Sequence, residues 1–237
     1  MHVTDRRRVL SLTAGVGLAA SAGVLLAGCG KDEDEGGEEV TANEDLMREH
    51  GVLRRILVLY REIAPRIAAD PARVDAAALG RAAALFRRFG EHYHEQLLEE
   101  RHIFPLVRGA GADQARLVDT LAAQHARGRQ ITDYVTDRTR TGAIGAGDAA
   151  PLSAALIAFA RMYEAHAARE DTIVFPAFKA ALGARRYDEL GDQFEEIEHR
   201  EFGGDGFDIA LAEVVRIEAA LGLPDLAAFT APPPGGA

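Results

Sequence analysis

The sequence predicts an all-α protein, an antiparallel four-helix up-down bundle with additional C-terminal helices. Hydrophobic residues make up 48% of the 237-residue chain, and Ala and Leu, which favour helices, are common among them. Alternating runs of β-branched residues, which would indicate strands, are hard to find. Histidines also recur at matching depths in four successive segments with helical periodicity. The formal charge of −10 argues against nucleic acid as a partner.

Residues 1–29 have the pattern of a bacterial export signal. Three arginines at 6–8 precede an apolar stretch from Val9 to Ala27, and small residues lie before Cys29, as at a cleavage point. The four residues that end at Cys29 resemble a lipobox, which implies cleavage before Cys29 and lipidation of its side chain. The first two arginines resemble a twin-arginine export signal, although Asp5 stands where Ser or Thr is usual.

The alternative for this apolar stretch is a true transmembrane helix, for which it is about long enough. Its Gly and Ala content and the cysteine at its end favour a cleaved signal. Residues 30–41 are Gly- and acid-rich and predict a flexible, solvated tether. We therefore expect an exported lipoprotein, anchored to the membrane by its lipid on the outer face of the cytoplasmic membrane or in the periplasm.

Four long helices are expected in a bundle domain at 42–182. The first begins with acids in its first turn, Pro65 should bend its last turns, and Pro105 should kink or end the second. A first-turn proline opens the fourth. The expected ranges are about 43–70, 74–106, 113–139 and 151–181.

A helical extension is expected at 183–230, followed by a loose Pro/Gly tail at 231–237. It should hold a short helix near 186–199, a Gly-rich turn at 203–206 and a last helix that ends at about Leu221.

Each bundle helix has one histidine at a matching depth, namely His50, His94, His125 and His166. His166 and Glu170 are four residues apart, so they share a helical face and can point at one ion. Imidazole combined with carboxylate suits iron among several first-row metals. A weak repeat, an acidic pair followed by Phe-Pro, ends both the second and the fourth helix and suggests that each helix pair supplies half of one site.

The segments around these histidines, together with the Phe-Pro repeat, resemble a hemerythrin-like, cation-binding bundle domain over about residues 44–178. The resemblance implies two non-haem irons, with histidines capping each ion and two carboxylates bridging them. Carried over to this chain, it implies the ligands His50, His94, Glu99, His125, His166 and Glu170.

The second helix departs from the family pattern, because the position four residues after His94 is Leu98. Glu99 lies five residues after His94, and a one-residue π-bulge would return both to one face. The alternatives are that Glu95 approaches the metal instead, or that this half-site is altered.

The remaining histidines are expected to be structural or surface residues. His2 lies in the signal, and His92 should face away from His94. His199 lies among acids that we interpret as a solvated face. A ferritin-like Glu-x-x-His site, formed from Glu91–His94 and Glu196–His199, is the second choice, and it lacks a convincing further pair of carboxylates.

The resemblance implies binding of a small diatomic ligand such as O2, for sensing, storage or carriage. The first alternative is a di-iron oxidase or peroxide-scavenging enzyme, and the second is a metal-free helical scaffold at the membrane surface. Manganese or zinc is not excluded by the residue types, and the redox partner is unknown. Tyr93, Tyr163 and Arg169 are candidates for tuning the site. No P-loop, nucleophile elbow or dinucleotide fingerprint appears in the sequence.

Overall fold

The computed structural model describes residues 40–223 and 225–235. The expected export signal, Cys29 and nearly all of the expected tether lie outside these residues. Over the described ranges the chain is helical without strands, so the predicted all-α class is confirmed. None of the helices described there is both long and apolar enough to cross a membrane.

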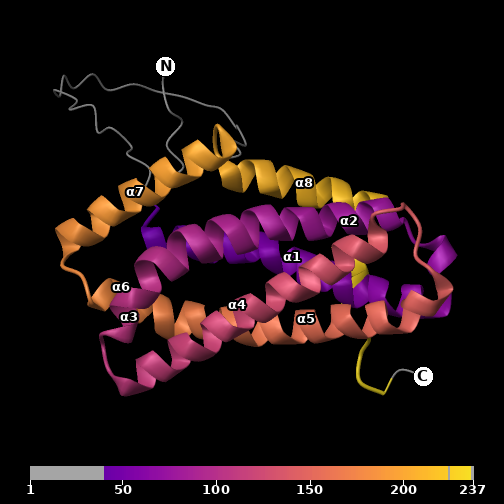
Figure 1. The fold of residues 1–237 in the computed structure, drawn as a ribbon, viewed down its shortest axis with the longest axis horizontal. Coiled ribbons are helices and arrows are strands. Elements are labelled where there is room, and N and C mark those ends of the chain that lie inside the picture. The colour runs from indigo at the N-terminus through magenta and orange to yellow at the C-terminus, as the bar shows by residue number, and fades with distance from the viewer. Residues whose placement is uncertain (1–39, 224, 236–237) are drawn as a thin grey trace, which may run out of the picture.

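The bundle consists of four antiparallel rods, two of which are interrupted (Figure 1). The first rod is α1 and the third is α4. The second comprises α2, the π-helix η2 and α3, and the fourth comprises α5, the short π-helix η4 and α6. Their bounds are α1 Ala42–Ala69, α2 Ala76–Leu85, η2 Phe86–Ile103, α3 Phe104–Arg108, α4 Ala112–Thr139, α5 Ala149–Arg169, η4 Glu170–Val174 and α6 Phe175–Ala180.

Helix α1 shows how the sequence sets an element. Thr41 and Glu44 form a reciprocal capping box at its start, since each side chain accepts the backbone N–H of the other. The helix continues through Pro65 and ends at Ala69, before Asp70 caps the short turn Pro71–Arg73. Its apolar face packs mainly against α5, while α2 packs against α4.

The helices expected at about 74–106 and 151–181 both widen into π-helix ahead of a Phe-Pro pair. Pro105 and Pro176 follow η2 and η4 and lie in the first turns of α3 and α6. Proline has no N–H to donate to the preceding turn. The rods therefore change their hydrogen-bond pattern at these prolines without ending.

Two C-terminal helices, α7 (Ala184–Phe202) and α8 (Gly206–Ala220), follow one another along one side of the bundle (Figure 1). Helix α7 is longer than expected, and Gly203 ends it in the left-handed conformation at φ 75°. Helix α8 packs on both α1 and α2. A last short turn, η5 (Leu226–Phe229), follows. The C-terminal extension thus covers the side of the bundle that α1 and α2 form.

Candidate metal centre

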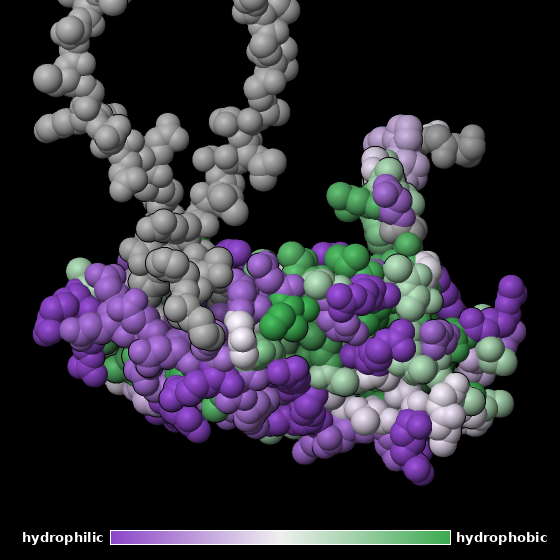
Figure 2. Space-filling view, turned by 90° about the horizontal axis from the view of Figure 1, so that it is seen from above, coloured by the Kyte–Doolittle hydropathy of each residue, from purple (hydrophilic) through white to green (hydrophobic). Residues whose placement is uncertain are grey.

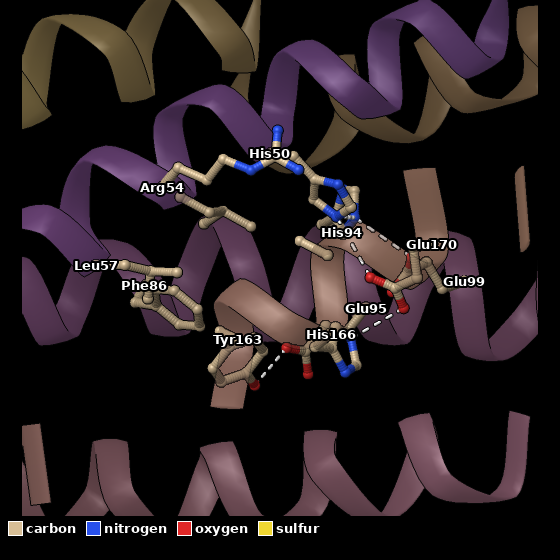
Figure 3. Close-up of a pocket in the computed structure, with 12 residues that line it drawn as sticks. His50, Arg54, Leu57, Phe86, His94, Glu95, Glu99, Tyr163, His166 and Glu170 are labelled. Atoms are coloured by element: carbon tan, nitrogen blue, oxygen red, sulfur yellow. Dashed lines mark hydrogen bonds and ion pairs between the residues drawn. The ribbon is translucent and has the colours of Figure 1, made fainter. Parts of the chain in front are cut away.

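Four histidines and two glutamates meet in the middle of the bundle, where none of the six is more than 3% exposed. They come from all four rods, and Figure 3 shows the Glu99 and Glu170 carboxylates pointing between the imidazoles. The residues are His50 on α1, His94 and Glu99 on η2, His125 on α4, His166 on α5 and Glu170 on η4. All six residues singled out in the sequence are therefore brought together.

The imidazoles form two pairs. The Nε2 atoms of His50 and His94 lie 3.0 Å apart, and those of His125 and His166 also lie 3.0 Å apart. The first pair joins the first two rods and the second pair joins the last two. The halves of the weak sequence repeat thus correspond to the two halves of this cluster.

Each glutamate spans the two pairs. Glu99 places Oε1 3.5 Å from His94 Nε2 and Oε2 3.4 Å from His125 Nε2. Glu170 places Oε2 3.5 Å from His50 Nε2 and Oε1 2.9 Å from His166 Nε2. Both oxygens of Glu99 and Oε1 of Glu170 are buried without a hydrogen-bond partner. Such atoms are costly unless a cation is bound.

The π-helix explains how the five-residue spacing in the second rod works. In the fourth rod His166 and Glu170 are four residues apart, and an α-helical turn brings them to one face. In the second rod the wider turn of η2 does the same for His94 and Glu99. The widening extends over Phe86–Ile103, and is therefore much longer than the expected one-residue bulge.

Every histidine in the cluster is held at Nδ1 by an oxygen from another rod. His50 meets Asp171 at 2.7 Å and His94 meets Glu49 at 2.6 Å. His125 meets Glu100 at 2.9 Å and His166 meets Gln124 at 2.9 Å. These contacts close a ring, in which each rod supplies the acceptor for the next and the fourth supplies it for the first.

The sequence analysis missed these four acceptors as site residues. Each one is the immediate neighbour of a residue in the cluster: Glu49 precedes His50, Glu100 follows Glu99, Gln124 precedes His125 and Asp171 follows Glu170. The second acid of each acidic pair in the repeat could have identified two of them. Because neighbouring helical residues point in different directions, an acceptor beside one ligand reaches the histidine of a different rod.

The acceptors also fix the tautomer. Three of them are carboxylates, which only accept when ionised, and the fourth is the Gln124 amide oxygen, so Nδ1 donates and Nε2 faces the cluster centre. Two Nε2 lone pairs 3.0 Å apart repel unless positive charge lies between them. Paired Nε2 atoms and unpartnered carboxylate oxygens therefore form a donor set that fits metal cations.

The electrostatics show the same demand for positive charge. Burial alone would lower the pKa of His125, but the surrounding carboxylates, Glu95 first among them, raise it to about 10. The carboxylates likewise outweigh burial at His94 and hold its pKa well above the usual range. Burial alone would raise the pKa of Glu170, but the neighbouring His166 and His50 hold this pKa well below its usual range.

Glu95, the alternative to Glu99, lies beside the cluster with both oxygens already occupied. Tyr163 Oη donates to Oε1 at 2.7 Å, and Arg129 Nη1 donates to Oε2 at 3.1 Å. The Glu99 oxygens have no such partners. This arrangement favours Glu99 over Glu95 as the group directed at an ion.

A small cavity of about 20 Å³ opens onto the cluster, and five of the six residues line it, with His125 the exception. This is room for about one water-sized molecule. Leu53, Leu57 and Phe86 form its apolar wall, and Arg54 also lines it (Figure 3). The cluster is therefore reachable by a molecule of very few atoms.

The other candidate histidines lie elsewhere. His92 is half exposed, with Nε2 3.3 Å from Glu201, and His199 and Arg169 are exposed. Glu91 accepts from Thr132 Oγ1 at 2.5 Å and pairs with Arg87 at 2.8 Å, away from the cluster. The ferritin-like arrangement is therefore not assembled. Glu198 is buried and accepts the Phe207 N–H, so the expected solvated face is only partly exposed.

A helical bundle whose four rods each supply histidine or glutamate to one buried cluster defines a metal-binding protein of the histidine–carboxylate class. The chain belongs to the hemerythrin HHE cation-binding domain family, whose model matches residues 41–178, and the predicted family is thereby confirmed. It is 41% identical over 238 residues to an uncharacterised protein of Mycobacterium bovis and to one of Mycobacterium tuberculosis, with 95% of this chain and 90% of each relative covered. No solved structure matches the chain.

Proposed function

We propose that this protein holds two iron ions in the buried cluster and binds O2 or a related diatomic molecule there. The observation that supports it is that Glu99 and Glu170 each direct one oxygen to each histidine pair. One ion would be held by His50 and His94 and the other by His125 and His166. Both glutamates would bridge them.

The donor set supports this proposal. Each ion would be held by two imidazoles whose Nε2 atoms lie 3.0 Å apart and by one oxygen of each glutamate. Imidazole combined with carboxylate suits iron among the first-row metals.

The chain's own residues then have defined roles. Asp171, Glu49, Glu100 and Gln124 orient the imidazoles. The small volume of the cavity excludes bulky molecules, and its apolar wall offers a bound water no hydrogen bonds. When bound, iron would supply the redox chemistry and the affinity for O2. Buried Glu95 and Tyr163 beside the cavity form a hydrogen-bonded pair of the kind that moves a proton in an enzyme, and this pair is the observation that favours the enzyme alternative.

Metal analysis of the purified full-length chain tests the proposal. We expect about two irons per chain, about one in the double variant His125→Ala/His166→Ala, and two in the control His92→Ala, whose side chain is on the surface. Reversible spectral change on O2 exposure supports a binder, whereas steady consumption of peroxide supports the enzyme. Absence of metal after anaerobic iron loading would refute the proposal and favour the scaffold.

We also propose export and lipid anchoring through residues 1–29, on the sequence pattern alone. Cell fractionation and labelling with a radioactive fatty acid test this: the chain should be in the membrane fraction and carry the label, and Cys29→Ala should lose the label. Arg6→Lys/Arg7→Lys should retain the precursor in the cytoplasm if the twin-arginine route is used. Undiminished labelling of the Cys29 variant would contradict the anchor.

A further inference from the structure

A second, larger hollow lies on the surface between α1, α8 and the C-terminal segment. Its volume is about 760 Å³, within the range of small-molecule sites. The hydrophobic side chains that gather there include Val58, Val215, Leu226 and Phe229. These are four of the seven large hydrophobic side chains exposed in the described part of the chain. Figure 2 shows hydrophobic surface gathered at the foot of the projecting C-terminal arm.

The lining of this groove carries two cationic and two anionic side chains, Arg54, Arg55, Glu218 and Asp225, so its formal charge sums to zero. Arg55 Nε donates to Glu218 Oε1 at 2.8 Å, and Arg54 pairs with Asp171 on the cluster side. Asp225 accepts the Ala227 N–H at 2.9 Å and caps η5. Since the lining has no net charge, an ionic ligand would find no excess of opposite charge. An uncharged apolar molecule fits this lining best.

Arg54 gives the groove one polar contact point. A guanidinium has five N–H donors, and the hydrogen bond to Asp171 uses Nη2. Donors of this kind suit a carbonyl oxygen, an acceptor that carries no net charge. Arg54 also lines the small cavity at the metal cluster, and its partner Asp171 holds His50. The groove is thus separated from the cluster by one side chain.

We propose that this groove binds an uncharged apolar molecule that carries a carbonyl-type acceptor, with the acceptor toward Arg54. The apolar body lies along Val58 and Val215 and under Leu226 and Phe229. Its binding does not depend on metal. The bound molecule would lie beside Arg54, which also lines the cavity at the metal cluster, so the metal centre would receive or sense this molecule. Only this last point rests on the function proposed above.

The test uses prodan, an uncharged naphthyl ketone with polarity-sensitive fluorescence, titrated into the full-length chain with and without metal. We expect saturable binding in both forms. Val58→Arg and Val215→Arg should each weaken it at least tenfold, because each places a charge in the apolar lining. Ile157→Arg is the matched control, since Ile157 is 41% exposed, Val58 is 40% exposed and Ile157 does not line the groove.

A pair of competitors tests the acceptor. In the metal-free chain, 2-acetylnaphthalene should displace prodan about tenfold better than 2-ethylnaphthalene, the effect of one hydrogen bond from a charged donor. In Arg54→Gln the two competitors should become equal. Equal competition in the unaltered chain would refute the role of Arg54.

The proposal is overturned if binding is absent, or if Val58→Arg and Val215→Arg bind prodan as well as the Ile157 control. It is also overturned if sedimentation shows a dimer that both groove variants dissociate, because a second copy would then fill the groove. Loss of metal binding with intact prodan binding would refute the proposed function and leave the groove assignment standing.

Discussion

Two glycines in the bundle helices offer a matched test of packing around the site. Gly51 lies on the exposed side of α1, and a Cβ added there meets nothing within 4 Å. Gly128 is buried in α4, and a Cβ added there would lie 2.0 Å from Tyr163 Oη. Gly128 therefore makes the room in which Tyr163 reaches Glu95. We predict that Gly→Ala has opposite effects on stability at these two positions.

The magnitudes follow from the same contacts. In a helix interior Ala is favoured over Gly by about 1 kcal/mol, so Gly51→Ala should stabilise the protein by up to that amount. At Gly128 overpacking costs about 1–3 kcal/mol. Displacing the Tyr163 hydroxyl leaves the buried Glu95 oxygen without this donor at a further cost of about 1–3 kcal/mol. Less the gain of about 1 kcal/mol from replacing Gly by Ala in a helix, Gly128→Ala should destabilise the protein by about 1–5 kcal/mol.

Urea unfolding of the metal-free protein, followed by circular dichroism, measures both effects. With a slope near 2 kcal/mol per molar, the two midpoints should differ by about 1 M or more, with Gly51→Ala above and Gly128→Ala below the unaltered protein. Equal slopes are needed for the comparison. If Gly128→Ala were as stable as Gly51→Ala, the close approach of Tyr163 to α4 would be refuted.

Three further predictions concern a site contact, a buried acid and a helix cap. Asp171→Asn should weaken metal binding roughly ten- to hundredfold, since it loosens His50, whereas exposed Asp113→Asn should leave a metal titration unchanged. Burial raises the pKa of Glu91 from 4.5 to about 7, so the folded state binds the extra proton and stability falls as pH rises from about 4.5 to 7, by up to about 3 kcal/mol. Glu91→Gln should flatten that part of the pH–stability curve, and an unchanged curve would contradict the assignment. Asp205→Ala removes the N-cap of α8 and should cost about 1 kcal/mol in thermal unfolding; no loss would show that the cap is dispensable.

The bundle was predictable because its helical periods, prolines and capping residues agree along the chain. The start of α1 at Ala42 and the end of α4 at Thr139 lie within a residue or so of the expected positions. The length of η2 was not predictable. A π-helix depends on hydrogen bonds five residues apart and on tertiary packing, and no residue type marks its ends. The five-residue spacing of His94 and Glu99 indicated only that one turn had to widen.

The six central residues were predicted through the resemblance to a known family, and the spacing of the second helix left Glu95 open as an alternative to Glu99. The Nδ1 acceptors could not be predicted, because each belongs to a different rod from its histidine. Glu49 reaches His94 only once α1 and η2 are packed, and a glutamate next to a histidine usually signifies nothing. The apolar groove depends on the place of η5 over α1 and α8, which no local pattern specifies.

The ring of Nδ1 contacts has a consequence for how the bundle opens. Every rod both gives and receives one of these contacts, so no rod can separate from the bundle without breaking two of them. Local unfolding of a single rod therefore costs the free energy of two hydrogen bonds at the cluster. Backbone amides there should exchange with solvent only when the four rods come apart together, even in the metal-free protein. The ring makes this region one cooperative unit before any ion arrives.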